Sequence, residues 1–207
     1  MFDEINKFFV MVKDEEFIFV IPNERCRKAT AIAITEMSKH NKNFVNLLNH
    51  TFRVAGASMY IAQKEKLTAA SKEICFLSAI FHDVFKEEEN HDVKGRDFAI
   101  KILKSLKYRQ NVIEKVAESI ADHSNSEKFL HTVEAKILWD ADKLDKLGAT
   151  AFLRRINERN LKIRLEKDKN IFLYLDSSKE IYRKRTEHTN ECLDTEEKMI
   201  KKDKILK

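Results

Sequence analysis

Two histidines stand where the surrounding pattern predicts the buried face of a helix. His50 follows Leu47 by three residues and precedes Val54 by four, and His123 follows Ile120 by three. Apolar residues at these spacings share one helical face, so both imidazoles are expected to point inward. An inward histidine standing alone is most often a hydrogen-bonded core residue, and its position alone assigns no chemistry.

Aspartates accompany these histidines on other apolar segments. His82 and Asp83 follow directly on the apolar run Ile74–Phe81, and Asp142 continues the apolar stripe of Leu138. A buried, unpaired carboxylate is costly, whereas several buried acids and imidazoles can share a cation. Imidazole nitrogens combined with carboxylate oxygens suit Mn, Fe, Co, Ni or Zn. Together these residues predict a metal site.

The elements that carry these residues are predicted to be helices throughout. The 207 residues include Gly 3 and Pro 1, where an average chain of this length has roughly 14 Gly and 10 Pro. A β-sandwich requires many Gly- and Pro-rich turns, and a nucleotide-binding α/β fold requires a glycine loop. We therefore expect an all-α fold, a compact helical bundle. Its helices are predicted at about 24–39, 42–64 and 68–81, from Asp92 as N-cap, from Asn111 with Glu114 as a capping box, and from Thr132 through Phe152.

The composition changes near residue 157, where charged residues replace most apolar ones. A short apolar run, Ile171–Leu175, is expected to pack on the core or on a partner subunit, and Asp176 or Ser177 is expected to cap a last helix through about Lys202. The end, Lys198 to Lys207, is expected to stay exposed. The chain is thus predicted to divide into an N-terminal preface (1–22), a helical catalytic domain (23–156) and a helical C-terminal extension packed on the core (157–207).

Charge and cysteine usage narrow the setting. Lys+Arg 39 and Asp+Glu 34 give a net charge of +5, with the two signs interleaved, which is typical of a solvated surface rather than a nucleic-acid-binding stripe. The three cysteines form no C-x-x-C pair. The longest apolar run has about eight residues, where a membrane span requires about 18. We expect a soluble cytoplasmic protein without membrane or nucleic-acid partners; a homodimer stays open.

The order of these residues resembles the HD superfamily of metal-dependent phosphohydrolases. His50, then His82 with Asp83, then His123, then Asp142 fall on different predicted helices. The resemblance covers about 50–155, half of the chain. The segments that carry it are HTFRVAGASMYIAQ (50–63), LSAIFHDVFK (77–86), HDVKGRDFAIKIL (91–103), IADHS (120–124) and EAKILWDADKLDKLGATAFLRR (134–155).

The resemblance implies a ligand set. His50, His82, Asp83 and Asp142 are expected to hold one divalent ion, which is Mn, Fe, Co, Ni, Zn or Mg. His91 and His123 match positions that bind a second ion in binuclear members, and we expect a single ion by a narrow margin. Asp140 and Asp145, which lie close to Asp142, are expected to support the ligands or to pack between helices.

The resemblance also implies a reaction. A metal with open coordination positions lowers the pKa of bound water, and Asp83 would both bind the metal and orient the attacking water. Arg53 and Lys86 lie three and four residues after ligand histidines, so both are expected to hold phosphate oxygens, with Lys86 also catalytic. Arg154 is a weaker candidate for a substrate phosphate. The expected function is hydrolysis of a small phosphate ester, a nucleotide or a related phosphorylated metabolite.

Two alternatives and one departure accompany this reading. A di-iron oxygenase on a similar scaffold uses four histidines and two aspartates, which the chain can supply. A non-enzymatic ligand-sensing or nucleic-acid-binding helical module would use the basic C-terminus as its contact. Phe85 replaces the glycine usual before the lysine of the family's motif, which predicts a narrower mouth to the site.

Overall fold

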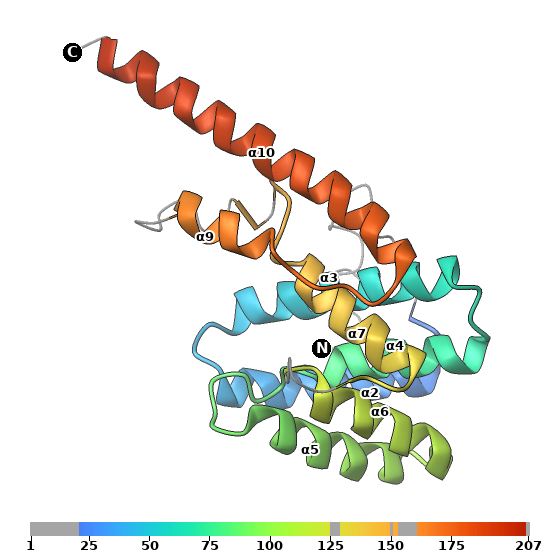
Figure 1. Ribbon diagram of the computed structural model, residues 1–207. Helices are drawn as coiled ribbons and strands as arrows, with labels where there is room; N and C mark the ends of the chain where they lie inside the picture. The colour runs from blue at the N-terminus through green and yellow to red at the C-terminus, as the bar shows by residue number, and fades with distance from the viewer. Residues whose placement is uncertain (1–20, 125–128, 150, 153–160, 206–207) are drawn as a thin grey trace.

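The computed structural model of this chain is a bundle of α-helices (Figure 1). It describes residues 21–124, 129–149, 151–152 and 161–205, and these ranges contain no strand, which confirms the predicted all-α fold. Nearly all of the predicted preface therefore lies outside the described residues. The helices are α2 (Glu24–His40), α3 (Phe44–Lys64), α4 (Ala69–Phe81), α5 (His91–Ser105), α6 (Gln110–Asp122), α7 (Val133–Leu144), α9 (Leu161–Asp168) and α10 (Asp176–Ile205).

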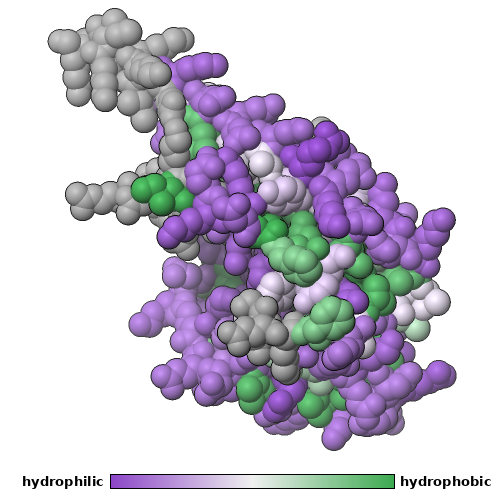
Figure 2. Space-filling model, viewed as in Figure 1, coloured by the Kyte–Doolittle hydropathy of each residue, from purple (hydrophilic) through white to green (hydrophobic). Residues whose placement is uncertain are grey.

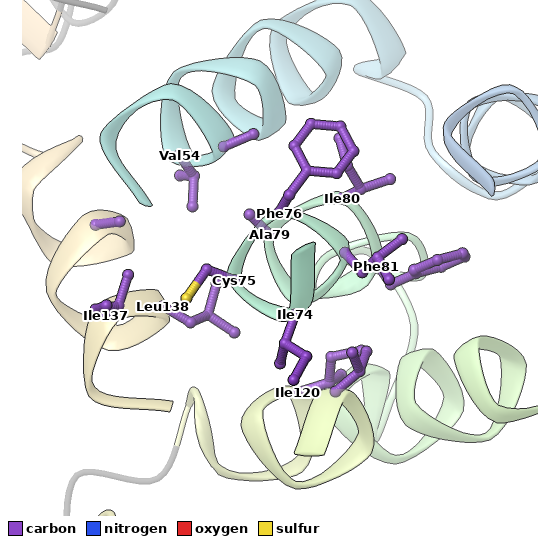
Figure 3. Close-up of a cluster of buried hydrophobic side chains, with 14 of the residues drawn as sticks. Val54, Ile74, Cys75, Phe76, Ala79, Ile80, Phe81, Ile120, Ile137 and Leu138 are labelled. Atoms are coloured by element: carbon purple, nitrogen blue, oxygen red, sulfur yellow. The ribbon is translucent and has the colours of Figure 1, made fainter. Parts of the chain in front are cut away.

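Helix α4 lies at the centre of the bundle. It packs against α2, α3, α5, α6 and α7, and its residues from Cys75 to Phe81 are almost completely buried. Figure 3 shows Val54, Ile120 and Ile137 approaching α4 from three neighbouring helices. Burial of this apolar surface is the main favourable contribution to folding. Because α4 ends immediately before the His-Asp pair, the same packing fixes the position of that pair.

Two predicted helix starts differ from the structure. α5 begins at His91 after Asn90, which has a left-handed backbone (φ 54), so Asp92 lies in the first turn and is not the N-cap. Asparagine tolerates this conformation better than most residues, which allows the sharp turn into α5. α6 begins at Gln110 with Arg109 as its N-cap, so Asn111 lies inside the helix and the predicted capping box is not formed. The Gln110 amide instead donates to Glu114 Oε1 (2.9 Å).

Of the two predicted ends of α7, the start agrees with the structure and the end does not. Thr132 is its N-cap as predicted, with Oγ1 accepting the Ala135 N–H (3.3 Å). The helix ends at Leu144, earlier than the predicted end at 152. Arg185 of α10 donates to the Leu144 carbonyl (2.9 Å), which satisfies one of the acceptors that a helix end leaves unpaired. Gly148 then takes a positive φ of 91°, which glycine adopts without strain.

The C-terminal segment joins the core at one end and leaves it at the other. Leu173 is buried in the core, and the Asp140 carboxylate accepts the backbone N–H groups of Tyr174 (2.9 Å) and Leu175 (3.0 Å). Asp140 is thus a helix-packing residue, one of the roles expected for it. α10 begins at Asp176 and extends past the bundle (Figure 1). No helix in the described ranges has the length and apolarity needed to cross a bilayer.

The three cysteines are expected to differ in reactivity. Cys26 and Cys75 are fully buried, and burial raises the pKa of the Cys26 thiol to about 12, whereas Cys192 is partly exposed. Because the thiolate is the reactive form, the native protein should react at one thiol per chain with an aromatic disulfide reagent, and at all three in denaturant. The variant Cys192→Ser should show no fast reaction. Fast reaction of a second thiol would contradict the buried positions.

Candidate metal centre

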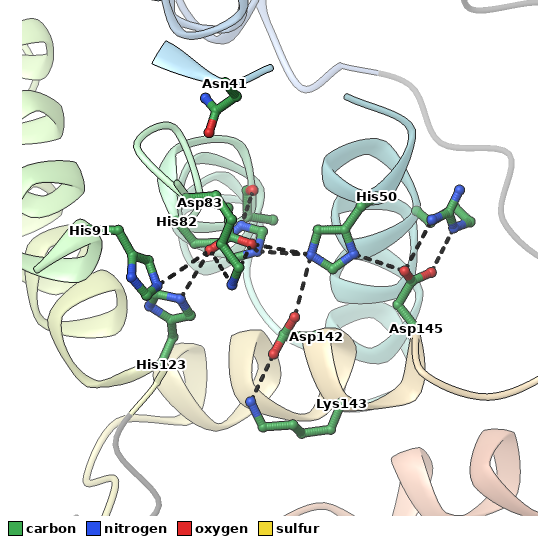
Figure 4. A network of polar contacts seen from close by, with 12 residues as sticks. Asn41, His50, His82, Asp83, His91, His123, Asp142, Lys143 and Asp145 are labelled. Carbon is green, nitrogen blue, oxygen red and sulfur yellow. Dashed lines mark hydrogen bonds and ion pairs between the residues drawn. The ribbon is translucent and has the colours of Figure 1, made fainter. Parts of the chain in front are cut away.

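The predicted ligands converge from five helices to one cluster. The first and the last of them, His50 and Asp142, lie about ninety positions apart in the sequence, yet Figure 4 shows them facing one another. His50 is on α3, His82 and Asp83 follow α4, His91 begins α5, His123 follows α6, and Asp142 is on α7.

Asp83 lies at the centre of this cluster, with its side chain fully buried. Its Oδ2 is 3.5 Å from His50 Nε2 and 3.4 Å from His82 Nε2. Its Oδ1 is 3.7 Å from His91 Nε2 and 3.3 Å from His123 Nε2. One carboxylate therefore stands between two pairs of imidazoles. In each of the two resulting groups, the ligand atoms lie within 4.8 Å of one another.

The other ring nitrogens show which atoms are available as ligands. His82 Nδ1 lies 2.7 Å from the Ala79 carbonyl, and His123 Nδ1 lies 2.6 Å from the Ile120 carbonyl. A carbonyl only accepts, so each Nδ1 must donate, and in a neutral ring Nε2 then carries the lone pair. Both lone pairs face the Asp83 carboxylate. That arrangement is repulsive unless it is offset by a metal ion or by a proton, such as one shared between His82 Nε2 and His50 Nε2, which lie 3.3 Å apart.

Unpaired buried atoms point to the same conclusion. Among the described residues, His91 Nε2 and His123 Nε2 are buried and have no hydrogen-bond partner. Burial and the nearby charge of Lys86 lower the pKa of His91, which favours the neutral, ligand-competent ring. Buried polar atoms without partners are rare in folded proteins. The donor set therefore fits a divalent metal ion.

Asp142 lies at the edge of the His50 group. Its Oδ1 is 3.4 Å from His50 Nε2, and its Oδ2 accepts a hydrogen bond from Lys143 Nζ (2.8 Å). Asp142 does not belong to either of the two three-residue groups found among the described residues. The role of Asp142 as a fourth ligand therefore stays a prediction.

Asp145 orients His50 from behind. Its Oδ2 accepts a hydrogen bond from His50 Nδ1 (2.8 Å), so the His50 Nε2 atom faces the cluster. Arg53 forms a bidentate pair with the same carboxylate, through Nε (2.6 Å) and Nη2 (3.1 Å). Carboxylates that hold a ligand histidine in this way fix its tautomer and ring orientation. Asp145 thus supports a predicted ligand, as expected. Arg53, which was expected to contact a substrate phosphate, pairs with Asp145 instead.

The cluster requires positive charge. Burial alone would lower the pKa of His50, but hydrogen bonds to Asp142, Asp145 and Asp83 outweigh it and raise that pKa well above its usual value. Burial likewise opposes ionisation of Asp83, yet the nearby His82 and the other imidazoles around the carboxylate hold its pKa well below its usual range. A proton on His50 or a bound divalent ion would supply this charge.

Lysines accompany the acidic residues of the cluster. Lys86 Nζ lies 3.1 Å and 3.0 Å from the two Asp83 oxygens, and its side chain is 47% exposed. Lys143 pairs with Asp142, and burial together with the Lys143 charge lowers the pKa of Lys146. Sequence reasoning identified only Lys86. Lys143 and Lys146 each directly follow an aspartate of the cluster, where a surface lysine is ordinary.

Two further predictions concern residues around the site. Phe85 is buried in the core. Its ring centroid lies 4.8 Å from that of His40 and 5.6 Å from that of Phe98. The predicted narrowing of the mouth by Phe85 is therefore wrong, because an aromatic ring here gains more by joining the core. Arg154 lies outside the described residues.

Asn41 is a supporting residue that sequence reasoning missed. Its amide nitrogen donates to the Val84 carbonyl (2.8 Å), and its Oδ1 accepts the Glu87 N–H (3.2 Å). Both partners belong to the turn that follows the His-Asp pair, as Figure 4 illustrates by the position of Asn41 above that turn. An asparagine after a predicted helix normally indicates only a helix end, so no functional signal was available.

Comparisons with known proteins agree with this geometry. A family model described as HD domain matches residues 47–147. A predicted HD superfamily hydrolase from an uncultured Thermotogales bacterium has a TM-score of 0.62 and 21% identity, covering 80% of this chain and 89% of that one. Bacillus subtilis YpgQ in complex with ADP has a TM-score of 0.66 and 18% identity, covering 86% and 96%. No curated protein sequence matches the chain.

The two kinds of match carry different weight. Identities this low show that the solved structures share the fold. The family match is more specific, because the segment 47–147 contains both ligand groups, Asp142 and Asp145. The chain therefore contains an HD domain over residues 47–147, and the proteins of that domain family bind divalent metal ions.

Proposed function

We propose that this protein is a phosphohydrolase that acts on small phosphate esters, with nucleotides as the favoured substrates. The HD domain and the ligand cluster support metal-dependent hydrolysis in general. The observation that carries the phosphate assignment is the pairing of Lys86 with Asp83 and of Lys143 with Asp142. Amines beside ligand carboxylates are suited to hold the oxygens of a phosphoryl group.

Two ions are proposed here, although the sequence narrowly favoured one. His50, His82 and Asp83, joined by Asp142, would hold the first ion, and Asp83, His91 and His123 would hold the second. Bound divalent ions lower the pKa of water and withdraw charge from a phosphoryl oxygen. Sharing of Asp83 by both groups supports this binuclear arrangement.

The chain's own residues would position the substrate and the attacking water. Lys86, half exposed beside Asp83, would bind a non-bridging phosphate oxygen, and Asp83 would orient the water. Arg53 would act as a positioning residue, because its guanidinium holds Asp145 and Asp145 holds His50. Arg154 remains a predicted contact to a substrate phosphate. The ADP bound to Bacillus subtilis YpgQ, which shares this fold, supports a nucleotide as substrate.

Metal analysis followed by a phosphate-release screen tests this function. Purified protein should contain about two divalent ions per chain, and phosphate release from nucleotides or sugar phosphates should be lost with a chelator and restored by metal. Metal-loaded protein that releases phosphate from none of these esters would contradict the proposal. No contact among the described residues favours the di-iron oxygenase, for which oxygen consumption would be the mark, or the non-enzymatic module.

Lys86→Met should separate phosphate binding from metal binding. The variant keeps every proposed ligand, so its metal content should match that of the wild type, while kcat falls by roughly 10² because one charge-assisted contact to the phosphoryl group is lost. If the contact acts equally on bound substrate and transition state, KM rises instead. Lys94→Met, which removes an exposed lysine paired with Glu88, is the matched control. Unchanged kinetics in Lys86→Met would show that this amine does not touch substrate.

A further inference from the structure

Exposed aromatic rings form a second surface feature beside the metal centre. Phe129 and Phe172 are 71% and 66% exposed, although large aromatic side chains are normally buried. Figure 2 shows hydrophobic side chains gathered over α7 on a face that is otherwise mainly hydrophilic. We call Phe129, Trp139, Phe172 and Tyr174 the aromatic surface. A grouped apolar patch of this kind usually marks a binding site.

The rings of the aromatic surface are arranged around Tyr174. Its ring centroid lies 4.9 Å from that of Phe172, 6.4 Å from that of Phe129 and 6.2 Å from that of Trp139. Trp139 itself is anchored, because its indole N–H donates to the Phe172 carbonyl (3.0 Å). Two exposed phenyl rings are thus held on a fixed base, in positions where a flat aromatic ligand can stack on them.

Lysine amines lie over these rings. Lys136 Nζ is 5.4 Å from the Phe129 centroid and 5.8 Å from the Tyr174 centroid. Lys143 Nζ is 4.3 Å from the Trp139 centroid and also bonds Asp142. A surface that combines aromatic faces with ammonium groups is complementary to a ligand that is both aromatic and anionic.

One face of α7 connects the aromatic surface with the metal centre. Lys136, Trp139 and Lys143 follow one another at spacings of three and four residues, so they share that face. Lys136 and Lys143 are separated by about 10 Å along the helix axis. Lys143 marks the end beside Asp142, and Lys136 marks the end beside the exposed phenyl rings. An extended nucleoside phosphate can span this path.

We propose that the aromatic surface binds the base of a nucleoside phosphate whose phosphate groups lie at the metal centre. This inference rests on the proposed function and specifies where that function's favoured substrate class is recognised. The base stacks on the exposed phenyl rings, and Lys143 contacts the phosphate chain between base and metal. Stacking accepts any base, so little discrimination among the four bases is expected.

Calorimetric binding of ADP and of inorganic pyrophosphate tests the proposal, because the two probes share a diphosphate and only ADP has a base. Phe129→Ala and Phe172→Ala should each raise the Kd for ADP by on the order of 10-fold and leave the Kd for pyrophosphate unchanged. Lys143→Met should weaken both probes. ADP should also change the fluorescence of Trp139, the single tryptophan of the chain, more than pyrophosphate does.

Controls keep the outcomes distinct. Both phenyl rings are exposed, so their removal should leave Tm nearly unchanged. Val45→Ala, which trims an apolar side chain that is 66% exposed on α3, should affect neither probe. Equal ADP affinity in the wild type and in both ring variants would overturn the base site. The base site would also be overturned if these variants lost a dimer while their ADP binding stayed unchanged. Pyrophosphate binding with no hydrolysis of any ester would instead contradict the proposed function.

Discussion

Replacing Asp83 with asparagine is expected to remove metal from both groups at once. Among the described residues, Asp83 is the one that belongs to both ligand groups, and the asparagine amide has the same shape but lacks the negative charge. The bound metal should fall from about two ions per chain to less than one, and phosphate release should fall on the order of 10³-fold or more. Metal content by mass spectrometry and initial rates at saturating metal measure both effects.

The control for this variant must change an aspartate outside the cluster. Asp97→Asn removes an exposed carboxylate whose ion pair among the described residues is with its neighbour Arg96, so metal content and rate should stay at wild-type values. Asp142→Ala removes a carboxylate near one group only, so it should lower metal occupancy by about one ion and reduce hydrolysis with it. An Asp83→Asn protein that keeps both ions would refute the shared-ligand arrangement.

Gly95→Leu is expected to damage both stability and the second ligand group. A Cβ added at Gly95 would lie 3.2 Å from the Phe81 carbonyl oxygen and 3.4 Å from that of His82, so a larger side chain would require the backbone at the end of α4 to shift. Forcing such a side chain into a packed interface typically costs about 1–3 kcal/mol. His91 lies one turn earlier on the same face of α5, so it should move away from Asp83.

Thermal unfolding and metal analysis together test the Gly95 prediction. Tm should fall by several degrees, and the metal content should drop by about one ion while the His50 group keeps its own. Gly95→Ala should have a smaller effect, because the better helix propensity of alanine offsets part of the tight contact. Two bound ions and an unchanged Tm in Gly95→Leu would show that α5 can shift without consequence for His91.

The helices were predictable because their apolar periodicity is strong, and their ends were less so. The end of α7 depends on a contact that a linear pattern does not contain, because Arg185 of α10 donates to the Leu144 carbonyl. Helix identity comes from local spacing, whereas helix termination here is decided by residues distant in the sequence.

The candidate site divides in the same way. The ligand residues were found because buried histidines and acids violate the apolar pattern of their helices. The partners of those ligands were found less completely: Lys143 and Asn41 lie at positions where a surface lysine and a helix-ending asparagine are ordinary. Which carboxylate Arg53 contacts depends on how α3 and α7 are rotated about their axes, and spacing within one helix does not determine that rotation.

The hydrogen bonds of Asn41 set the shortest fragment of this chain that could work as a unit. The family match begins at residue 47, after Asn41 and after the whole of α2. A fragment excised at that boundary would retain every ligand but lose the amide that holds Val84 and Glu87, along with the His40 contact to Glu88. The turn after its His-Asp pair would lose that anchor. The segment that matches the family is therefore shorter than the segment needed for a competent site.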